Sequence, residues 1–188
     1  YNSMCAAICA LELGFSINTV ATAIESIKGI KGRAESVPTG RDFTVIIDYA
    51  HTPDGLENIA RTLKACCAGR LIAVFGCGGD RDNKKRPIMG GIALDLADKV
   101  VVTSDNPRTE DPEKIIDQIF VALQDVPAGK EVYRISDRRE AIEYVLANAE
   151  ADDVIMIAGK GHENYQILKD RTIHFDDREV VLEYWSEK

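Results

Sequence analysis

Short apolar runs alternate with segments of helical periodicity over most of this chain. Runs of apolar, mostly β-branched residues that suit buried strands occur at 43–49, 71–75, 99–103, 132–135 and 154–158. Segments with apolar residues at helical spacing lie between them, at 53–66, 87–97, 112–123 and 138–149. Strands without polar alternation are typical of parallel sheets that helices cover on both faces. The pattern therefore predicts an α/β, Rossmann-like three-layer domain with a mostly parallel sheet.

The alternation changes near the C-terminal end of the chain. Tyr165–Leu168 and Thr172–Phe175 each alternate polar and apolar residues, and a charged turn over 169–171 separates them. Two short alternating segments around such a turn indicate a β-hairpin. We therefore expect a closing hairpin after the last sheet strand, followed by a helix over Arg178–Trp185.

The first thirty residues form a separate pattern. An Ala-rich apolar helix is expected to end at Gly14, and residues 17–27 repeat apolar positions at helical spacing. Apolar helices need a partner face, and these two precede the sheet pattern rather than belong to it. We therefore predict that residues 1–31 are the C-terminal tail of a different domain and that residues 32–188 form the Rossmann-like domain.

Composition narrows the classes of partner. The 188 residues carry a net charge of −8 with a pI near 5.0, which argues against nucleic acid or an anionic membrane as the main partner. No apolar run approaches the roughly 18 residues of a membrane span and no signal-peptide pattern is visible, so a cytoplasmic protein is expected. The five cysteines form no C-x-x-C pair and are expected to be reduced.

Four polar loops follow four of the predicted strands. In chain order they read DYAHTP (48–53), GCGGDRD (76–82), SDNPR (104–108) and AGKGHE (158–163). Parallel strands place their carboxyl ends at one edge of a sheet, where open α/β folds bind ligands. The convergence of Asp, Arg, His, Lys and Glu among glycines at that edge predicts a binding site there.

The third loop carries the most specific chemistry. Pro107 restricts the backbone around it, so Asp105 and Arg108 are held on a stiff loop. A carboxylate and a guanidinium three residues apart suit a ligand that carries both an ammonium group and a carboxylate. The glycines of the second loop permit close approach to an anion, and Asp48 and His51 lie at a helix entry that favours phosphate.

Each loop also has a purely structural explanation. DNPR alone is as consistent with a surface turn, Asp48 and His51 could only satisfy backbone donors, and the glycine loop could be a plain turn. No Ser or Cys nucleophile with a neighbouring base stands out and no Cys/His metal cluster is visible, so we assign no catalytic or metal-ligating residue. The side chains favour transfer chemistry helped by phosphate and Mg²⁺ over covalent catalysis.

Four motifs, read together and in order, resemble those of the Mur ligases of peptidoglycan synthesis: DYAHTPDGLE, GCGGDRD followed by KRP, SDNPRTEDP and AGKGHE. The resemblance covers essentially the whole chain. It implies an ATP-dependent amide ligase with a UDP-sugar domain, a central ATPase domain and a C-terminal Rossmann-like domain that brings the incoming amino acid. In that family ATP activates a carboxylate as an acyl phosphate, which the amino group of the incoming amino acid attacks. Residues 1–31 would then be the end of the central ATPase domain.

The resemblance also implies roles for single residues. It places ATP-facing residues at Arg33, Asp48 and His51. It places residues that bind meso-diaminopimelate at Arg81, Asp105, Asn106, Arg108, Gly159 and Glu163. The second substrate would be the UDP-N-acetylmuramoyl dipeptide, bound by domains outside this chain.

Other assignments remain open. A ligase that adds lysine, or one of the folylpolyglutamate type, would share the motifs, although Arg108 favours the distal carboxylate of diaminopimelate that lysine lacks. A non-catalytic amino-acid-binding module is the third candidate. The chain has no phosphate loop, and the family's Mg²⁺-binding positions lie in the central domain. ATP and Mg²⁺ are therefore expected to bind mainly outside this chain, which alone is predicted to be inactive.

Overall fold

The computed structural model describes residues 2–27 and 29–186, and the chain divides into two compact units, 1–30 and 31–188. The proposed assignment of residues 1–31 to the tail of another domain stays a prediction, and Tyr1, Lys28 and residues 187–188 lie outside the described part.

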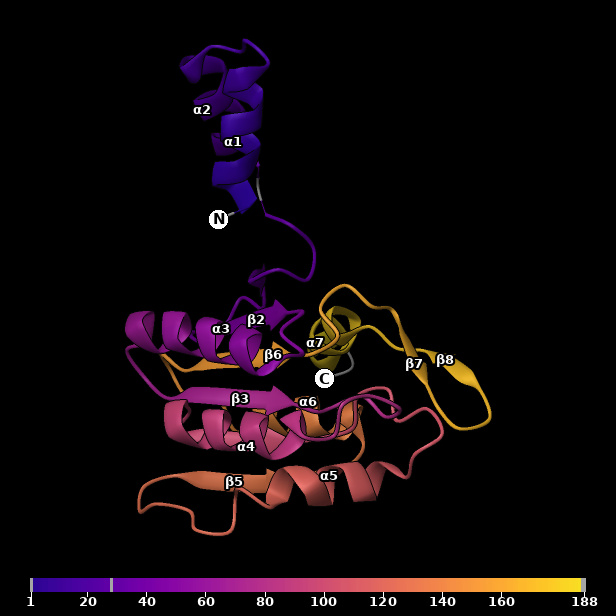
Figure 1. The fold of residues 1–188 in the computed structure, drawn as a ribbon. Helices are drawn as coiled ribbons and strands as arrows, with labels where there is room; N and C mark the ends of the chain where they lie inside the picture. The colour runs from indigo at the N-terminus through magenta and orange to yellow at the C-terminus, as the bar shows by residue number, and fades with distance from the viewer. Residues whose placement is uncertain (1, 28, 187–188) are drawn as a thin grey trace. The chain divides into compact units, whose positions relative to one another are not determined.

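The smaller unit is a pair of helices, α1 (Asn2–Glu12) and α2 (Ile17–Glu25) (Figure 1). Ser16 caps α2, because its side chain accepts a hydrogen bond from the Thr19 backbone N–H at 3.1 Å. Among the described residues of this unit, Val20 is the buried apolar side chain. The two helices therefore bury little apolar surface on their own.

The larger unit contains a six-stranded sheet in the order β1-β2-β6-β3-β4-β5. The strands are β1 (Glu35–Val37), β2 (Thr44–Asp48), β6 (Val154–Ala158), β3 (Leu71–Phe75), β4 (Lys99–Val102) and β5 (Glu131–Arg134). Every neighbouring pair from β2 to β5 is parallel, and only β1 pairs antiparallel with β2 within this sheet. The prediction of a mostly parallel sheet is confirmed.

Helices cover both faces of the sheet, as Figure 1 shows. The helices α3 (Pro53–Cys66), α4 (Lys85–Leu96) and α5 (Pro112–Phe120) pack on one face, and α6 (Arg138–Ala147) and α7 (Asp177–Ser186) on the other. Successive β3 residues supply opposite cores, because strand side chains alternate: Ala73 packs with α3 to α5, and Ile72 and Val74 with α6 and α7. The predicted three-layer arrangement is confirmed.

The C-terminal hairpin is also confirmed. Strands β7 (Tyr165–Ile167) and β8 (Thr172–His174) pair antiparallel in a sheet of their own. The hairpin docks on the loop after β4, because the Gln166 amide donates to the Asp105 carbonyl at 2.7 Å and the Arg108 N–H donates to the Ile167 carbonyl at 3.0 Å. The hairpin thereby supports the DNPR loop.

Three of the differences from the sequence-based expectation are instructive. Strand β1 was not expected, since three residues are too few to show a period. Helix α4 begins at Lys85 rather than Pro87, which lies inside its first turn. Helix α5 ends at Phe120 rather than Leu123, because the Leu123 N–H donates to the Phe120 carbonyl at 3.0 Å, and this bond across three residues tightens the chain out of the α-helix.

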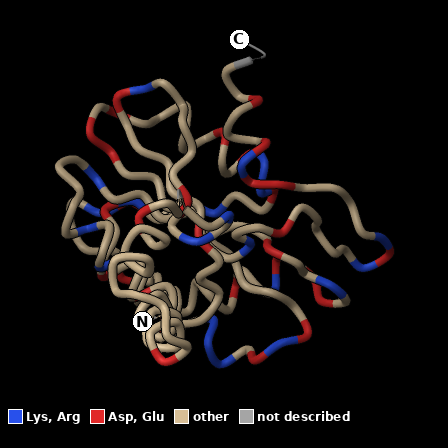
Figure 2. Tube along the Cα trace, turned by 90° about the horizontal axis from the view of Figure 1, so that it is seen from above, with Lys and Arg blue, Asp and Glu red and all other residues tan. Residues whose placement is uncertain are grey.

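Basic and acidic residues are interspersed along the trace, without a long stretch of one sign (Figure 2). Among the helices that the structure describes, none has the length and apolar character needed to cross a bilayer.

Candidate functional site

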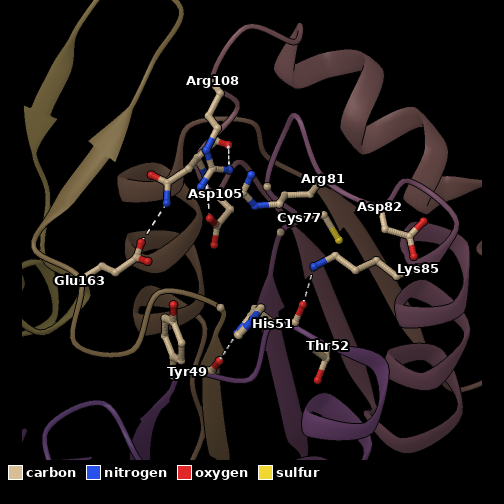
Figure 3. A pocket seen from close by; sticks show the side chains of 14 residues that line it. Tyr49, His51, Thr52, Cys77, Arg81, Asp82, Lys85, Asp105, Arg108 and Glu163 are labelled. Atoms are coloured by element: carbon tan, nitrogen blue, oxygen red, sulfur yellow. Dashed lines mark hydrogen bonds between the residues drawn. The ribbon is translucent and has the colours of Figure 1, made fainter.

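A cavity of about 400 Å³ lies where the loops after β2, β3, β4 and β6 meet (Figure 3). Its lining comes from all four loops: Tyr49, His51, Thr52, Gly76, Cys77, Gly78, Arg81, Asp82, Lys85, Asp105, Asn106, Arg108, Gly159 and Glu163. All six residues predicted to bind the amino acid line it, and so does His51. Arg33 and Asp48 do not.

The loop after β4 holds Arg108 in a restrained conformation. Arg108 has φ 52°, a left-handed value that is uncommon for a residue with a side chain. Its guanidinium Nη1 donates to the Gly79 carbonyl at 2.9 Å and to the Asn106 carbonyl at 3.3 Å. These bonds join the loops after β3 and β4 and hold the guanidinium at the cavity wall.

Asp105 is a nearly buried carboxylate whose Oδ1 accepts the Asn106 N–H at 2.7 Å. Gly159 passes directly beside its other oxygen. A Cβ at Gly159 would lie 2.7 Å from Asp105 Oδ2, and the φ of Gly159 is +116°. Both the space and the backbone conformation therefore require glycine at this position.

Glu163 reaches the cavity from the loop after β6. Its Oε2 accepts a hydrogen bond from Asn106 Nδ2 at 2.8 Å and contacts the Lys160 ammonium at 3.3 Å. The Asn106 carboxamide also accepts the Ile167 N–H at 2.9 Å, so the hairpin, the DNPR loop and Glu163 are joined through it.

The loop after β3 brings Arg81 to the cavity and is anchored from behind by Arg86. Arg86 is buried and donates to Glu110 at 2.8 Å and to the Gly78 carbonyl at 3.1 Å. The hydrogen bond from Arg86 is the main cause that lowers the pKa of the Glu110 carboxyl. Because this anchor lies behind the loop, Arg81 projects from a supported backbone.

The three residues predicted to face ATP have different surroundings. The Asp48 carboxylate accepts a hydrogen bond from the Ala34 N–H at 2.7 Å, and Ala34 has a left-handed φ of 45°. The Arg33 guanidinium lies 5.0 Å from the centre of the Tyr49 ring. His51 lines the cavity, and its Nδ1 is 2.8 Å from the Tyr49 carbonyl.

Sequence reasoning assigned no site role to five lining side chains: Tyr49, Thr52, Cys77, Asp82 and Lys85. Burial is the main cause that raises the pKa of Tyr49, helped by the nearby Glu163 and Asp105 carboxylates and by the Tyr165 phenol. The Lys85 ammonium donates to the His51 carbonyl at 2.6 Å and so joins α4 to the loop after β2.

Cys77 is another of these side chains. Burial raises the pKa of its thiol to about 12, so the thiol is a packing group rather than a nucleophile. Tyr49 and Cys77 lie inside the motifs that predicted the site, so their position in those motifs was an available signal. Lys85 begins the KRP segment that follows the second motif, but its hydrogen bond to the His51 carbonyl depends on where α4 begins.

The arrangement suits a small zwitterion. Two guanidinium groups and two carboxylates from the loops after β3, β4 and β6 line one cavity: Arg81, Arg108, Asp105 and Glu163. Within the described residues, no group of three or more His, Cys, Asp or Glu side chains could hold a metal ion. The roles predicted for the single residues stay predictions.

Comparison with known proteins places the chain in a family. Residues 32–161 match the family described as Mur ligase, glutamate ligase domain. A protein of Caldanaerobacter subterraneus named UDP-N-acetylmuramoyl-L-alanyl-D-glutamate–2,6-diaminopimelate ligase is 52% identical over 187 residues, which are 100% of this chain and 38% of that protein. The chain thus spans under two fifths of the length of this relative.

Solved structures agree with this placement. The structure of a UDP-N-acetylmuramoyl-L-alanyl-D-glutamate–2,6-diaminopimelate ligase superposes with a TM-score of 0.77 and 43% identity, over 97% of this chain and 37% of that one. A bifunctional folylpolyglutamate synthase/dihydrofolate synthase of Yersinia pestis, complexed with AMPPNP and manganese, shares the fold with a TM-score of 0.62 and 20% identity, over 80% of this chain and 33% of that one. The match over residues 32–161 and the likeness over the whole chain establish that this protein belongs to the Mur ligase family.

Proposed function

We propose that this chain is the C-terminal, amino-acid-binding part of an ATP-dependent ligase that adds meso-diaminopimelate to UDP-N-acetylmuramoyl-L-alanyl-D-glutamate in peptidoglycan synthesis. The observation that carries the proposal is the meeting of two guanidinium groups and two carboxylates in one cavity. The names of the similar proteins support the choice of amino acid. In this proposal residues 1–31 are the tail of the central ATPase domain, and residues 32–188 are the C-terminal domain.

The charge balance of the cavity favours a ligand without net charge. Among the described lining residues, the cations Arg81, Lys85 and Arg108 face the carboxylates Asp82, Asp105 and Glu163. meso-Diaminopimelate carries two ammonium and two carboxylate groups, so its charges cancel, whereas lysine keeps one excess ammonium. A balanced cavity therefore gains more from the first ligand than from the second.

The residues divide by the charge that they bind. Arg108 and Arg81 suit the carboxylates of the amino acid, since a guanidinium matches a carboxylate with two parallel hydrogen bonds. Asp105 and Glu163 suit its ammonium groups, Asn106 fixes Glu163, and the glycine at 159 leaves room beside Asp105. This chain thereby positions the amine that attacks the acyl phosphate, with formation of a C–N bond and release of phosphate.

The nucleotide would meet this chain at the loop after β2. His51 stands before the amino end of α3, which favours negative charge, and Arg33 adds a guanidinium close by. Asp48 holds the backbone of Ala34 and so supports this loop. In this proposal Mg²⁺ and most ATP contacts belong to the rest of the enzyme. The proposed reaction places the enzyme in the cytoplasm, where ATP is available.

The test is steady-state ligation by the full-length enzyme with Arg108→Ala. Loss of a charge-assisted hydrogen bond raises the KM for meso-diaminopimelate about 10- to 100-fold, and the preference over L-lysine falls by a similar factor. The matched control is Arg171→Ala, an exposed arginine at the hairpin tip, which leaves both values unchanged.

Two outcomes would count against the proposal. An unchanged KM in Arg108→Ala would remove the amino-acid site from this cavity, and a wild-type preference for L-lysine would favour the lysine-adding alternative. The chain of 188 residues alone is expected to show no ATP- and Mg²⁺-dependent ligation, and measurable turnover by it would contradict the assignment of catalysis to the absent part.

A further inference from the structure

Lys160 is a fully buried cation behind the wall of the cavity. It follows Gly159 at the end of β6, and its ammonium lies 5.5 Å from the centre of the Tyr165 ring. A buried lysine is costly unless its charge and its donors are matched, so its surroundings show what holds it. Burial lowers its pKa, while Asp105 and Glu163 oppose that effect.

The Lys160 ammonium contacts two of the residues proposed to bind the amino acid. Its Nζ lies 3.3 Å from Asn106 Oδ1 and 3.3 Å from Glu163 Oε2. Asn106 Nδ2 in turn donates to the same Glu163 oxygen at 2.8 Å. The three side chains therefore form a closed triangle on the side of the cavity that receives an ammonium group.

This triangle fixes which way the Asn106 carboxamide points. Its oxygen faces two donors, Lys160 Nζ and the Ile167 N–H, the latter at 2.9 Å. A flipped carboxamide would place its NH₂ group against both donors and its oxygen against the Glu163 carboxylate. Lys160 thus favours the orientation in which Asn106 donates to Glu163.

The triangle also settles which oxygen of Glu163 meets the ligand. Both protein contacts fall on Oε2, so an incoming ammonium group takes Oε1. A carboxylate held at one oxygen has lost rotational freedom before the ligand arrives, and such preorganisation raises affinity.

We propose that Lys160 is a positioning residue that holds Asn106 and Glu163 in the arrangement that binds the ammonium group of the incoming amino acid. The inference rests on the proposed function and extends it to a residue that does not itself touch the ligand. Lys160 acts through Glu163, so its effect depends on the presence of that carboxylate. Its effect is also expected to be confined to the amino acid, because in the proposed function the nucleotide meets this chain at the loop after β2.

The experiment uses the full-length enzyme with Lys160→Met, Glu163→Gln and the double variant. Lys160→Met is expected to raise the KM for meso-diaminopimelate about tenfold, the size of one charge-assisted hydrogen bond, with less than about twofold change in the KM for ATP. Added to Glu163→Gln, it is expected to raise that KM no further, because the carboxylate that it positions is gone.

One control variant is added, and the double variant guards against a loss of folding. Lys169→Met is the matched control, an exposed lysine at the hairpin tip, and leaves all constants unchanged. The double variant removes both charges of the pair, so it does not leave the partly buried Glu163 carboxylate without its cation. Its comparison with Glu163→Gln still tests the proposal if Lys160→Met alone fails to fold.

The outcomes separate the two proposals. If Glu163→Gln leaves the KM for the amino acid unchanged, the proposed function fails. If Glu163→Gln raises it and Lys160→Met does not, only the role of Lys160 fails. A lower KM in Lys160→Met would also overturn the inference, since Lys160 would then act by repelling the ligand. Equal, additive effects with and without Glu163 would show a general structural role.

Discussion

Gly159 shows how one position can serve both backbone and site. Its φ of +116° lies in the region that favours glycine, and a Cβ at this position would lie only 2.7 Å from Asp105 Oδ2. Its backbone N–H also donates to the Asp48 carbonyl at 3.1 Å, which ties the ends of β6 and β2. The carboxylate proposed to bind an ammonium group therefore depends on a residue that contributes no side chain.

Gly159→Ala separates strain from steric exclusion when it is compared with Gly129→Ala. Gly129 has φ +84° and open space around it, so its replacement costs about 1–2 kcal/mol through backbone strain alone. Gly159→Ala adds a clash with Asp105 and is expected to cost about 1–3 kcal/mol more. Urea unfolding of both variants measures the difference, and equal losses would contradict the clash.

At the residue scale, the position of a charged side chain near the cavity was foreseeable from the sequence, whereas its pairing with a backbone group was not. Arg81, Asp105, Arg108 and Glu163 reach the cavity, as their charge and position at strand ends indicated. Asp48 has the same charge and position, yet its carboxylate binds the Ala34 N–H. The left-handed conformation of Ala34 that creates this donor position has no sequence signal.

At the scale of elements, the Asp153 carboxylate joins the amino ends of β6 and β3, at the edge of the sheet opposite the cavity. Asp153 precedes β6, is 2% exposed, and accepts the Arg70 and Glu150 backbone N–H groups at 2.9 Å each and the Arg70 guanidinium at 2.7 Å. Burial tends to raise the pKa of Asp153, but the hydrogen bonds together outweigh it, so the pKa is lowered. The pair of strands β6 and β3 is thereby fastened at its start.

Asp153→Asn should destabilise the protein in a pH-dependent way. Because the pKa of Asp153 is lower in the folded state, its stabilisation is fully present above its unfolded value of about 3.9 and is lost as the pH falls through the folded value. The variant is expected to lose about 2–3 kcal/mol at pH 7 and progressively less below about pH 4. Chemical unfolding at several pH values measures this, with the exposed Asp125→Asn as the control. A loss that does not change with pH would contradict the argument.

Elements with a strong period were predictable, and short or paired ones were not. Strands such as β3 and β6 were predictable, because helices cover both faces of the sheet and each strand is therefore a continuous run of five apolar residues. Strand β1 has three residues and exists through its pairing with β2, which no local pattern encodes. The same holds for the docking of the hairpin on the DNPR loop, which joins residues about sixty positions apart.

At the scale of the molecule, the two units differ in how they bury apolar side chains. The larger unit has a core on each face of its sheet. In the smaller unit large apolar side chains are exposed, among them Met4 at 64%, Leu13 at 78% and Ile17 at 63%. Exposed apolar surface of this kind is typical of an interface, which agrees with the proposal that these helices end another domain.

Removal of residues 1–30 tests whether the larger unit folds by itself. Because its apolar cores are formed by its own sheet and helices, the variant is expected to unfold at the same urea concentration and with the same cooperativity as the chain of 188 residues.

In the chain of 188 residues, hydrogen exchange is expected to be fast in α1 and α2 and slow in the central strands, since α1 and α2 bury few apolar groups. Protection of α1 and α2 equal to that of β3 in a monomeric sample would mean that the helices have found a partner surface within the chain. A lower unfolding midpoint without residues 1–30 would then identify the larger unit as that partner.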